Sequence, residues 1–541
     1  MNISRRMFLG SSAAAFAAEL FAGQKDSKAP NPALEKLADV ALQQAKKLKA
    51  SYCDIRINRY RDQNVLVRLT PERGTGKTLE VPGISDTDSF GFGVRVIVNG
   101  AWGFASSPIV TPAEIARITG EAVTVAKANA SIKSKPVILA PTKSYRDRWS
   151  SPYDRNPFDV PIPEKLALLL EVGREIKKEK RVFSSNASLT FHSEDKYFAS
   201  SDGSSIQQLI IQTFANSSAN AVDIQKRLSK SRSYIPTPLA TGYEFVPTMN
   251  LLENAQRIRE EVIEHLKAPS VTAGKKDLVL TPSHLFLTIH ESVGHPTELD
   301  RALGYEANFA GTSYLTPDKL RKERIASEHV SIYGDRTTER ALATVAYDDD
   351  GVKTTKFPLI DKGIFAGYQT IRDQAYLIGE KESRGCCYAD SWASVPFQRM
   401  PNVSMEPGKP DVALDDLISG VDDGVFIEGR GSYSIDQQRY NFQFGGDAFW
   451  EIKGGKKRGM LSQVAYQART PDFWKACDGV AGPSYWQLCG SGADGKECRI
   501  STSGALQVAQ LFQLGQIDSG FSTRHRLFTS HQQAPLARPI H

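Results

Sequence analysis

The sequence predicts an α+β protein, in which an N-terminal domain of mixed helices and strands precedes a C-terminal β-rich domain of antiparallel barrel or sandwich type. Helical and strand-like periodicities alternate in the first half of the chain. Beyond about residue 338, short strand-like runs alternate with turn signals such as Asp350-Gly351 and Gly454-Gly455. The 541 residues, 40% of them hydrophobic, are enough for two or three domains with sizeable cores.

Five segments are expected along the chain: a signal peptide at 1–24, a polar linker at 25–32, the N-terminal domain at 33–245, the C-terminal domain at 246–527 and a flexible tail at 528–541. Ser4-Arg5-Arg6-Met7-Phe8-Leu9 has the pattern of a twin-arginine export signal, and a short apolar run follows it. No other stretch approaches the ~20 apolar residues that span a bilayer. We therefore expect export to the periplasm and a soluble mature protein without a membrane anchor.

The N-terminal domain is predicted to contain helices at 34–48, about 111–128 and 163–180, and strands at 52–69, 92–105 and 182–222. Residues 92–105 form a hairpin, because Asn99-Gly100 is the dipeptide that a two-residue turn prefers. Thr111-Pro112-Ala113-Glu114 is a capping box, and Asp202-Gly203 marks a further turn. We find no chemistry in this domain and expect it to shape a cleft and contact a partner.

A helix at 250–266 marks the domain boundary, and a strand at 277–280 leads into the segment on which the chain is centred. Thr281 and Pro282 have the pattern of an N-cap and first helical residue. Leu285, Phe286, Ile289 and Val293 then form an apolar stripe, and Pro296 ends the segment. We expect a buried helix here.

This helix carries His290-Glu291-Ser292-Val293-Gly294-His295, a His-Glu-x-x-x-His segment. Two neutral imidazoles can hold Zn²⁺, which lowers the pKa of a bound water to ~7, and a carboxylate beside them can accept its proton as the general base. On an α-helix, residues i and i+5 lie roughly 140° apart around the axis, so the two histidines would not share a metal. We predict a single wide turn of the π kind, which Gly294 would make possible through its backbone freedom.

The residue pattern leaves the third zinc ligand open. A catalytic zinc usually has three protein ligands. The candidates are Glu298, Glu306, Cys386, Cys387, Cys477, Cys489 and Cys498. Glu298, and less so Asp300, is instead a candidate to orient a histidine ligand by a hydrogen bond. His284 lies on nearly the opposite helix face from His290 and is not expected to bind the metal.

Charge excludes one class of partner. The net charge is only +6, and no Lys/Arg run is interleaved with aromatic residues, so nucleic acid is not an expected ligand. In an oxidising compartment, Cys477 and Cys498 could form a disulfide.

The segment HESVGHPTELDRALGYEANFAGTSYL, residues 290–315, resembles the metal-site region of the TldD/PmbA family of peptidases. Further similarities follow at Tyr347-Asp348-Asp349-Asp350-Gly351, Asp361-Lys362-Gly363, Arg399-Met400-Pro401-Asn402 and Leu488-Cys489-Gly490. The resemblance implies one zinc ion per chain held by His290, His295 and Cys489, with Glu291 as the general base. It further implies short or unfolded peptides as substrates, in a narrow cleft between paired subunits that are identical chains or sister chains.

The leading hypothesis is therefore a zinc-dependent peptidase. The same family contains sister chains that lack the metal motif and act as structural partners, which is the alternative function. The intact His290, Glu291 and His295 argue against that alternative. A metal-storage role is weakened by Glu291, which a storage site would not require.

Overall fold

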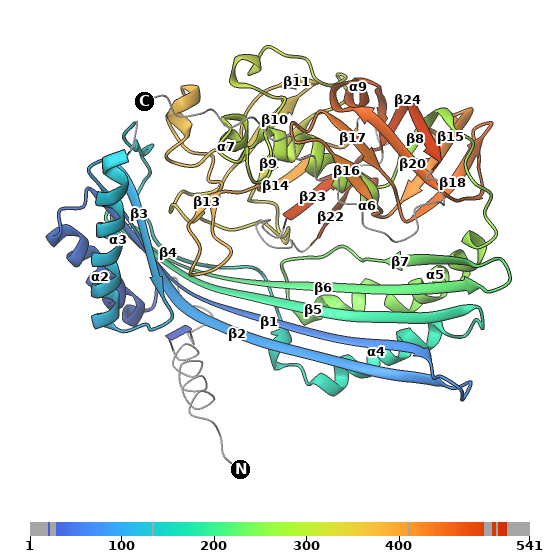
Figure 1. Ribbon diagram of the computed structural model, residues 1–541, viewed down its shortest axis with the longest axis horizontal. Coiled ribbons are helices and arrows are strands. Elements are labelled where there is room, and N and C mark those ends of the chain that lie inside the picture. The colour runs from blue at the N-terminus through green and yellow to red at the C-terminus, as the bar shows by residue number, and fades with distance from the viewer. Residues whose placement is uncertain are drawn as a thin grey trace, which may run out of the picture.

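The computed structural model describes residues 20–21, 29–132, 135–408, 412–491, 500–504 and 507–516, the last two segments and residue 491 as backbone only. Most of the expected signal peptide and linker and all of the expected tail at 528–541 lie outside the described residues. In the described part, no helix is long and apolar enough to cross a membrane. Figure 1 shows a long, curved sheet of N-terminal strands with the C-terminal domain lying along one of its faces.

The N-terminal sheet has seven strands in the order β3-β2-β1-β5-β6-β4, with β7 also paired to β6. Their bounds are β1 Tyr52–Pro71, β2 Thr78–Val98, β3 Ala101–Ser107, β4 Arg146–Ser150, β5 Val182–Ser200, β6 Ser205–Asp223 and β7 Leu228–Tyr234. The predicted hairpin is confirmed, because β2 and β3 pair antiparallel across Asn99 and Gly100, which both have positive φ. The turn at Asp202-Gly203 likewise joins β5 to β6.

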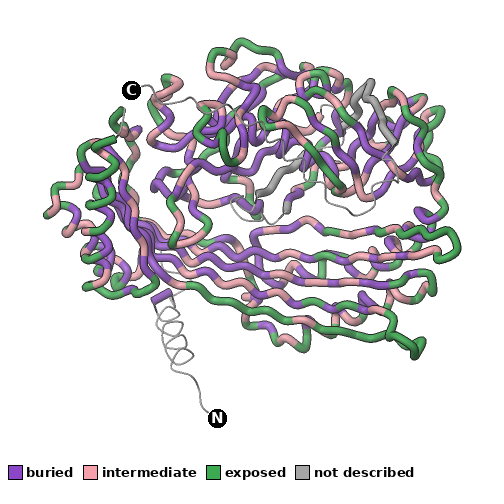
Figure 2. The backbone as a smooth tube through the Cα atoms, viewed as in Figure 1, coloured by how far each residue is buried: buried purple, intermediate pink, exposed green. Residues whose placement is uncertain are grey.

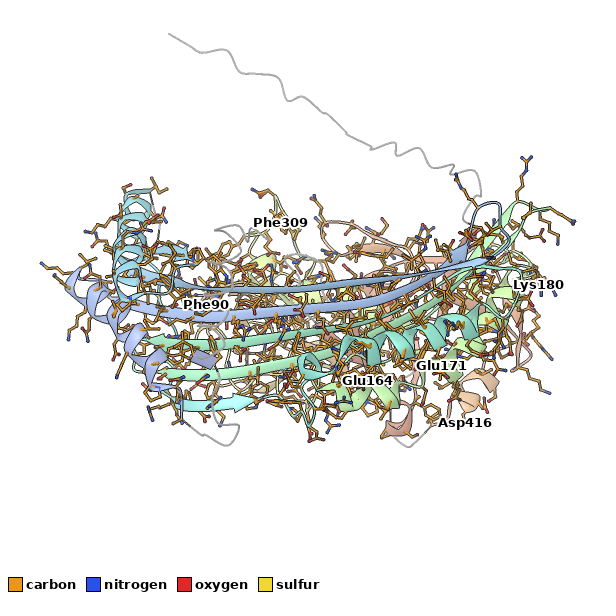
Figure 3. The ribbon with its side chains drawn as sticks, turned by 90° about the horizontal axis from the view of Figure 1, so that it is seen from below. Phe90, Glu164, Glu171, Lys180, Phe309 and Asp416 are labelled. Atoms are coloured by element: carbon orange, nitrogen blue, oxygen red, sulfur yellow. The ribbon has the colours of Figure 1, made fainter. Side chains whose placement is uncertain are left out.

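Four helices cover one face of this sheet. α2 (Pro32–Lys47) and α3 (Pro112–Ile132) lie at one end, and α4 (Ile162–Ile176) and α5 (Leu251–His265) lie toward the other, as Figures 1 and 3 show. Alternate residues of β1 supply both cores: Ile55 and Ile57 pack in the α2/α3 cluster, and Val65 and Val67 in the α4/α5 cluster. This period of two places the intervening polar residues on the opposite face. All four helices were predicted within a few residues of these bounds.

The polar face of the sheet is buried by the C-terminal domain, and the Tyr347–Gly351 motif makes the contact. Asp349 lies 2.7 Å from the ammonium of Lys196, and Asp350 lies 2.7 Å from the guanidinium of Arg95. Asp348 accepts hydrogen bonds from the backbone N–H groups of Asp350, Val352 and Cys387 and so shapes the loop itself. Figure 2 shows the strands most completely buried toward the α2/α3 end of the sheet.

A second junction lies at β7. Arg232 is 1% exposed, and its guanidinium pairs with Glu261 of α5 at 2.6 Å and with Glu428 and Asp447 of the C-terminal domain. A cation with three carboxylate partners from three segments therefore joins the two domains.

The C-terminal domain contains two larger sheets and one strand pair. The first has the order β11-β10-β9-β14-β23-β22, and the second β16-β17-β20-β24-β8-β15-β18-β19, with β21 paired to β24. The strands are β8 Gly274–Leu280, β9 Ile332–Asp335, β10 Lys356–Asp361, β11 Ile364–Phe365, the pair β12 Cys387–Tyr388 and β13 Phe397–Gln398, β14 Asn402–Met405, β15 Asp423–Glu428, β16 Tyr433–Ile435, β17 Asn441–Phe444, β18 Ala448–Lys453, β19 Lys457–Leu461, β20 Val464–Arg469, β21 Cys477–Val480, β22 Gln487–Ser491, β23 Ile500–Gly504 and β24 Gln507–Gln516. Its helices are α6 Pro282–Ile289, α7 Leu299–Ala302, α8 Leu414–Ser419 and α9 Thr470–Lys475.

These pairings confirm a mixed α+β fold, but they do not confirm the antiparallel barrel, which was one of the two forms expected for this domain, the other being a sandwich. Among the described residues, neither sheet closes on itself, and both contain a parallel pair, β8 with β15 and β14 with β23. The turn signals predicted strands joined by short connections, whereas the two partners in each parallel pair are far apart in the sequence. Helix α6 packs against β14, β22 and β23 of one sheet and β15 of the other. The predicted histidine helix therefore lies between the two sheets.

Candidate metal centre

The helix that carries the histidines widens where the spacing requires it. α6 starts at Pro282 after Thr281, whose side chain bonds to Ser283 and Ile427 rather than capping the helix. The regular helix ends at Ile289, and one π turn spans His290–Gly294, in which the N–H of His295 donates to the carbonyl of His290. The imidazole centroids of His290 and His295 lie 4.5 Å apart. The predicted wide turn is confirmed.

Gly294 serves this turn in a different way from the one expected. Its φ of −54° and ψ of −62° are ordinary right-handed helical angles that any residue adopts. A Cβ at this position would, however, lie 2.6 Å from Sδ of Met400, which is fully buried. Glycine is therefore favoured by the close approach of Met400 and not by backbone torsion. Gln369 Nε2 and Thr297 Oγ1 both donate to the Gly294 carbonyl and so stabilise the end of the turn.

His290, Glu291 and His295 form a buried group in which one potential ligand atom from each residue lies within 4.8 Å of the others. Nε2 of His290 is 3.9 Å from Oε1 of Glu291. The two imidazoles are nitrogen donors of the kind that zinc prefers, and the carboxylate beside them can accept a proton from a water at the ion. The donor set therefore fits a zinc ion.

A chain of charged side chains orients His295. Its Nδ1 lies 2.6 Å from Oε2 of Glu298, and that carboxylate is also 3.0 Å from the guanidinium of Arg301. Burial raises the pKa of Glu298, but Arg301 and His295 outweigh it and hold the pKa at about 2. Arg301 also pairs with Glu306, so Glu298 and Glu306 both face a cation. Asp300 differs, because burial and these two neighbouring carboxylates raise its pKa.

Arg439 was not identified from the sequence, although it contacts the centre of the site. Its guanidinium donates a hydrogen bond to the carboxylate of Glu291, and its other terminal nitrogen donates to the carbonyl of Ala310 at 3.3 Å. Arg439 lies 148 positions from Glu291 in the chain and belongs to no motif with it. Only the fold brings the two together.

The cysteines occupy separate places. Cys489 is buried on β22, the strand that packs against α6, and burial raises the pKa of its thiol to about 12. It is not part of the group whose ligand atoms lie within 4.8 Å of one another. Cys386 and Cys387 lie at β12, where the N–H of Cys387 donates to Asp348. Cys477 is on β21, and Cys498, its expected disulfide partner, lies outside the described residues.

His284 has a structural environment, as its helix position predicted. Its Nδ1 lies 2.9 Å from the carbonyl of Gly429 and its Nε2 2.8 Å from the hydroxyl of Tyr466. Both ring nitrogens therefore have protein partners and the ring is fully buried.

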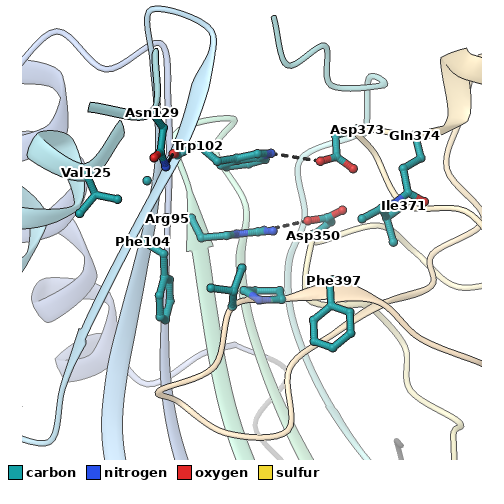
Figure 4. A pocket seen from close by; sticks show the side chains of 13 residues that line it. Arg95, Trp102, Phe104, Val125, Asn129, Asp350, Ile371, Asp373, Gln374 and Phe397 are labelled. Carbon is teal, nitrogen blue, oxygen red and sulfur yellow. Dashed lines mark hydrogen bonds and ion pairs between the residues drawn. The ribbon is translucent and has the colours of Figure 1, made fainter. Parts of the chain in front are cut away.

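A pocket of about 440 Å³ lies at the domain junction, where Figure 4 shows Trp102 and Phe104 facing residues of the C-terminal domain. Trp102 Nε1 donates to Asp373 at 3.1 Å, and the Arg95–Asp350 ion pair forms part of the wall. None of its lining residues belongs to the His-Glu-His group. The pocket is therefore separate from the candidate metal centre.

The fold and this site define an α+β protein with a candidate metal centre buried inside its C-terminal domain. The sequence matches PmbA/TldA metallopeptidase domain 1 over residues 79–126, the central domain over 155–268 and the C-terminal domain over 273–503. The chain thus carries the three metallopeptidase domains of the PmbA/TldD family, in order.

Curated relatives agree with this assignment, and solved structures share the fold. A metalloprotease of Methanocaldococcus jannaschii is 27% identical over 461 residues, which cover 84% of this chain and 94% of that protein. A protein named zinc metalloprotease TldD homolog, from Saccharolobus solfataricus, is 25% identical over 396 residues, covering 71% and 79% of the two chains. The structure of TldE from Thermococcus kodakarensis, at 17% identity, aligns with a TM-score of 0.69 over 89% of this chain and 100% of its own. A Thermotoga maritima structure described as a modulator of a DNA gyrase gives the same TM-score and coverage at 16% identity. These two structures support the fold alone.

Proposed function

We propose that this protein is a zinc-dependent peptidase whose centre is formed by His290, Glu291 and His295. The observation that carries the proposal is the π turn, which brings two buried imidazoles to a centroid separation of 4.5 Å beside a carboxylate. An uninterrupted α-helix would separate the same residues around its axis. π turns inside helices occur frequently at functional sites.

The residues have distinct roles in this proposal. His290 and His295 would hold the ion through ring nitrogens, and the Glu298 contact at Nδ1 would leave Nε2 of His295 for the metal. Zinc, when bound, would supply a Lewis acid that polarises the scissile carbonyl and lowers the pKa of water. Glu291 would accept the proton of the attacking water and pass it to the leaving amine.

Cys489 is proposed as the third ligand. Support comes from the family resemblance around Leu488-Cys489-Gly490 and from the packing of β22 against α6. Thiolate ligation requires loss of the thiol proton, which zinc promotes strongly. A Cys489→Ser variant should therefore bind zinc more weakly at equal fold stability, and X-ray absorption at the zinc edge should lose a sulfur neighbour. Unchanged zinc affinity would remove Cys489 from the ligand set.

Short or unfolded peptides are the proposed substrates. We further propose that they bind in a cleft between paired subunits and that the protein is exported by the twin-arginine route. The resemblance to TldD/PmbA peptidases and the Ser4–Leu9 sequence support these proposals. Light scattering on the purified protein would test pairing, and cell fractionation of the full chain beside an Arg5→Lys/Arg6→Lys variant would test export.

Cleavage of an unstructured peptide tests the proposed function. Glu291→Gln should abolish turnover while keeping the metal, because the amide cannot accept the proton. Glu323→Gln, at an exposed acidic residue, is the matched control and should leave turnover unchanged. Equal turnover in wild type and Glu291→Gln would reject the proposed role of Glu291.

A further inference from the structure

Arg439 is held in a backbone conformation that a non-glycine residue rarely adopts. It lies in the turn between β16 and β17 with a φ of +63°. The Asp436 carboxylate accepts hydrogen bonds from the N–H groups of Tyr440 and Asn441, and Thr470 donates to the Arg439 carbonyl at 2.7 Å. Left-handed backbone is disfavoured at such a residue, and such conformations cluster at functional sites. The surrounding hydrogen bonds stabilise this turn in spite of that cost.

The strained turn directs a cation to the candidate general base. The Arg439 side chain is 13% exposed, and its guanidinium contacts the Glu291 carboxylate. The second terminal nitrogen donates to the Ala310 carbonyl, which Arg301 also contacts at 3.0 Å. The two arginines therefore fix the segment at Ala310 next to both Glu291 and the Glu298–His295 pair.

The position of Glu291 limits where the reacting carbonyl can lie. A general base must come within hydrogen-bond distance of the water whose proton it takes. That water oxygen forms a bond to the carbonyl carbon, so the carbonyl oxygen lies only a few ångströms from the base. A guanidinium in contact with the same carboxylate is therefore within reach of that oxygen, and its N–H groups form a planar fork of donors that suits an anionic oxygen.

We propose that Arg439 binds the oxygen of the scissile carbonyl as that oxygen gains negative charge, an inference that rests on the proposed peptidase function. In the addition step, the water oxygen bonds to the carbonyl carbon, the carbonyl π electrons move to the carbonyl oxygen, and the water proton moves to Glu291. Arg439 donates to the resulting oxyanion. When the C–N bond breaks, its electron pair stays with the amine, which takes the proton from Glu291, and the oxyanion re-forms the carbonyl.

The affinities of the full-length protein for two ligands distinguish oxyanion binding from simple peptide binding. One ligand is a phosphinic peptide, which presents an anionic tetrahedral centre, and the other is an ordinary peptide of the same sequence. Peptide affinity is measured in the Glu291→Gln background to prevent cleavage. Arg439→Ala should weaken phosphinic-peptide binding about 100–1,000-fold, the range for loss of one oxyanion donor. Peptide affinity should change by less than about threefold, zinc content should remain one per chain, and kcat should fall with little change in KM. Added guanidinium ion should partly restore turnover.

Two further variants complete the experiment. Arg340→Ala is the matched control, because Arg340 also has a positive φ, at 61°, but its side chain is half exposed and pairs with Glu339. Arg439→Lys keeps the positive charge and replaces the alanine variant in this experiment if that variant does not fold. The lysine variant should lose most of its affinity for the phosphinic peptide, because lysine cannot reproduce the fork of N–H donors.

Equal loss of affinity for both ligands, or loss of zinc, would assign Arg439 to binding or structure and overturn the inference. Unchanged affinity of Arg439→Ala for the phosphinic peptide would also overturn the inference. If the wild-type protein still cleaved peptides, the peptidase proposal would remain. A wild-type protein that neither holds zinc nor cleaves peptides would reject the peptidase proposal itself and the inference with it.

Discussion

Nδ1 of His295 lies 2.6 Å from Oε2 of Glu298, and both side chains are buried. Because Glu298 is also paired with Arg301 and its pKa is held at about 2, the carboxylate is ionised at neutral pH. It accepts the Nδ1 proton of His295 and so fixes the tautomer in which Nε2 carries a lone pair. The sequence offered Glu298 both as a zinc ligand and as a residue that orients a histidine. The hydrogen bond to His295 supports the second role.

Glu298→Gln should lower zinc affinity by about 10–100-fold, the usual effect of losing such a partner. The amide presents no charge to the imidazole and removes one of the two carboxylates that pair with Arg301. Competition with a chromophoric chelator measures the affinity. Asp300→Asn is the control, because Asp300 is also buried and the amide has nearly the same shape as its carboxyl group. Equal losses in the two variants would count against a specific role for Glu298.

Gly294→Ala should destabilise the protein by about 1–3 kcal/mol through overpacking, because the added methyl would lie 2.6 Å from Sδ of Met400. Denaturant unfolding measures the effect. In a Met400→Ala background, which empties the space the methyl would enter, the same substitution should cost much less. A cost that is the same in both backgrounds would show that backbone torsion, and not space, requires glycine here.

Acid should destabilise the scaffold of the metal helix through His284. Burial lowers the pKa of His284 to about 4, against about 6.5 in an unfolded chain. Between these values only the unfolded state binds the proton, so the stability contribution is complete above pH 6.5 and is lost as pH falls to 4, by about 3 kcal/mol. Unfolding of wild type and His284→Gln by urea, between pH 7 and 4, should show the wild type losing more stability by that amount. Parallel pH profiles would contradict this.

The Arg232 junction should make a large contribution to stability. Arg232→Met leaves Glu261, Glu428 and Asp447 close together without their cation, and the expected cost is about 3–5 kcal/mol. The thermal unfolding midpoint should fall accordingly. Adding Asp447→Asn should recover part of the loss, because it removes one uncompensated carboxylate. Additive losses in the double variant would mean that the three acids do not act as a unit.

Local features of the fold could be predicted because their causes are local. The positive φ at Asn99 and Gly100 follows from the two residues themselves, and the helices follow from apolar periodicity and caps. The π turn could also be predicted, because a helical His290 and His295 can share a ligand only if the turn between them widens.

Other features depend on residues that are distant in the sequence. The parallel pairing of β8 with β15 joins segments about 150 residues apart, and no turn signal specifies it. Arg439 reaches Glu291 across 148 positions. Gly294 is required by the nearby side chain of Met400, which lies about 100 residues later in the sequence. Asp349 and Asp350 join the domains through ion pairs with Lys196 and Arg95, which also lie far away in the sequence. Sequence patterns indicate such residues by type but do not identify their partners.

The zinc content of the purified chain tests the proposed metal centre when it is measured by elemental analysis for wild type, His290→Ala and His295→Ala. His284→Gln serves as a control histidine outside the site. We expect one zinc per chain in the wild type and the control and less than about a tenth of that in the two motif variants. Circular dichroism should show that all four proteins remain folded. Folded wild-type protein that holds no stoichiometric metal under zinc-replete conditions, or motif variants that bind zinc as the wild type does, would contradict the proposed metal centre.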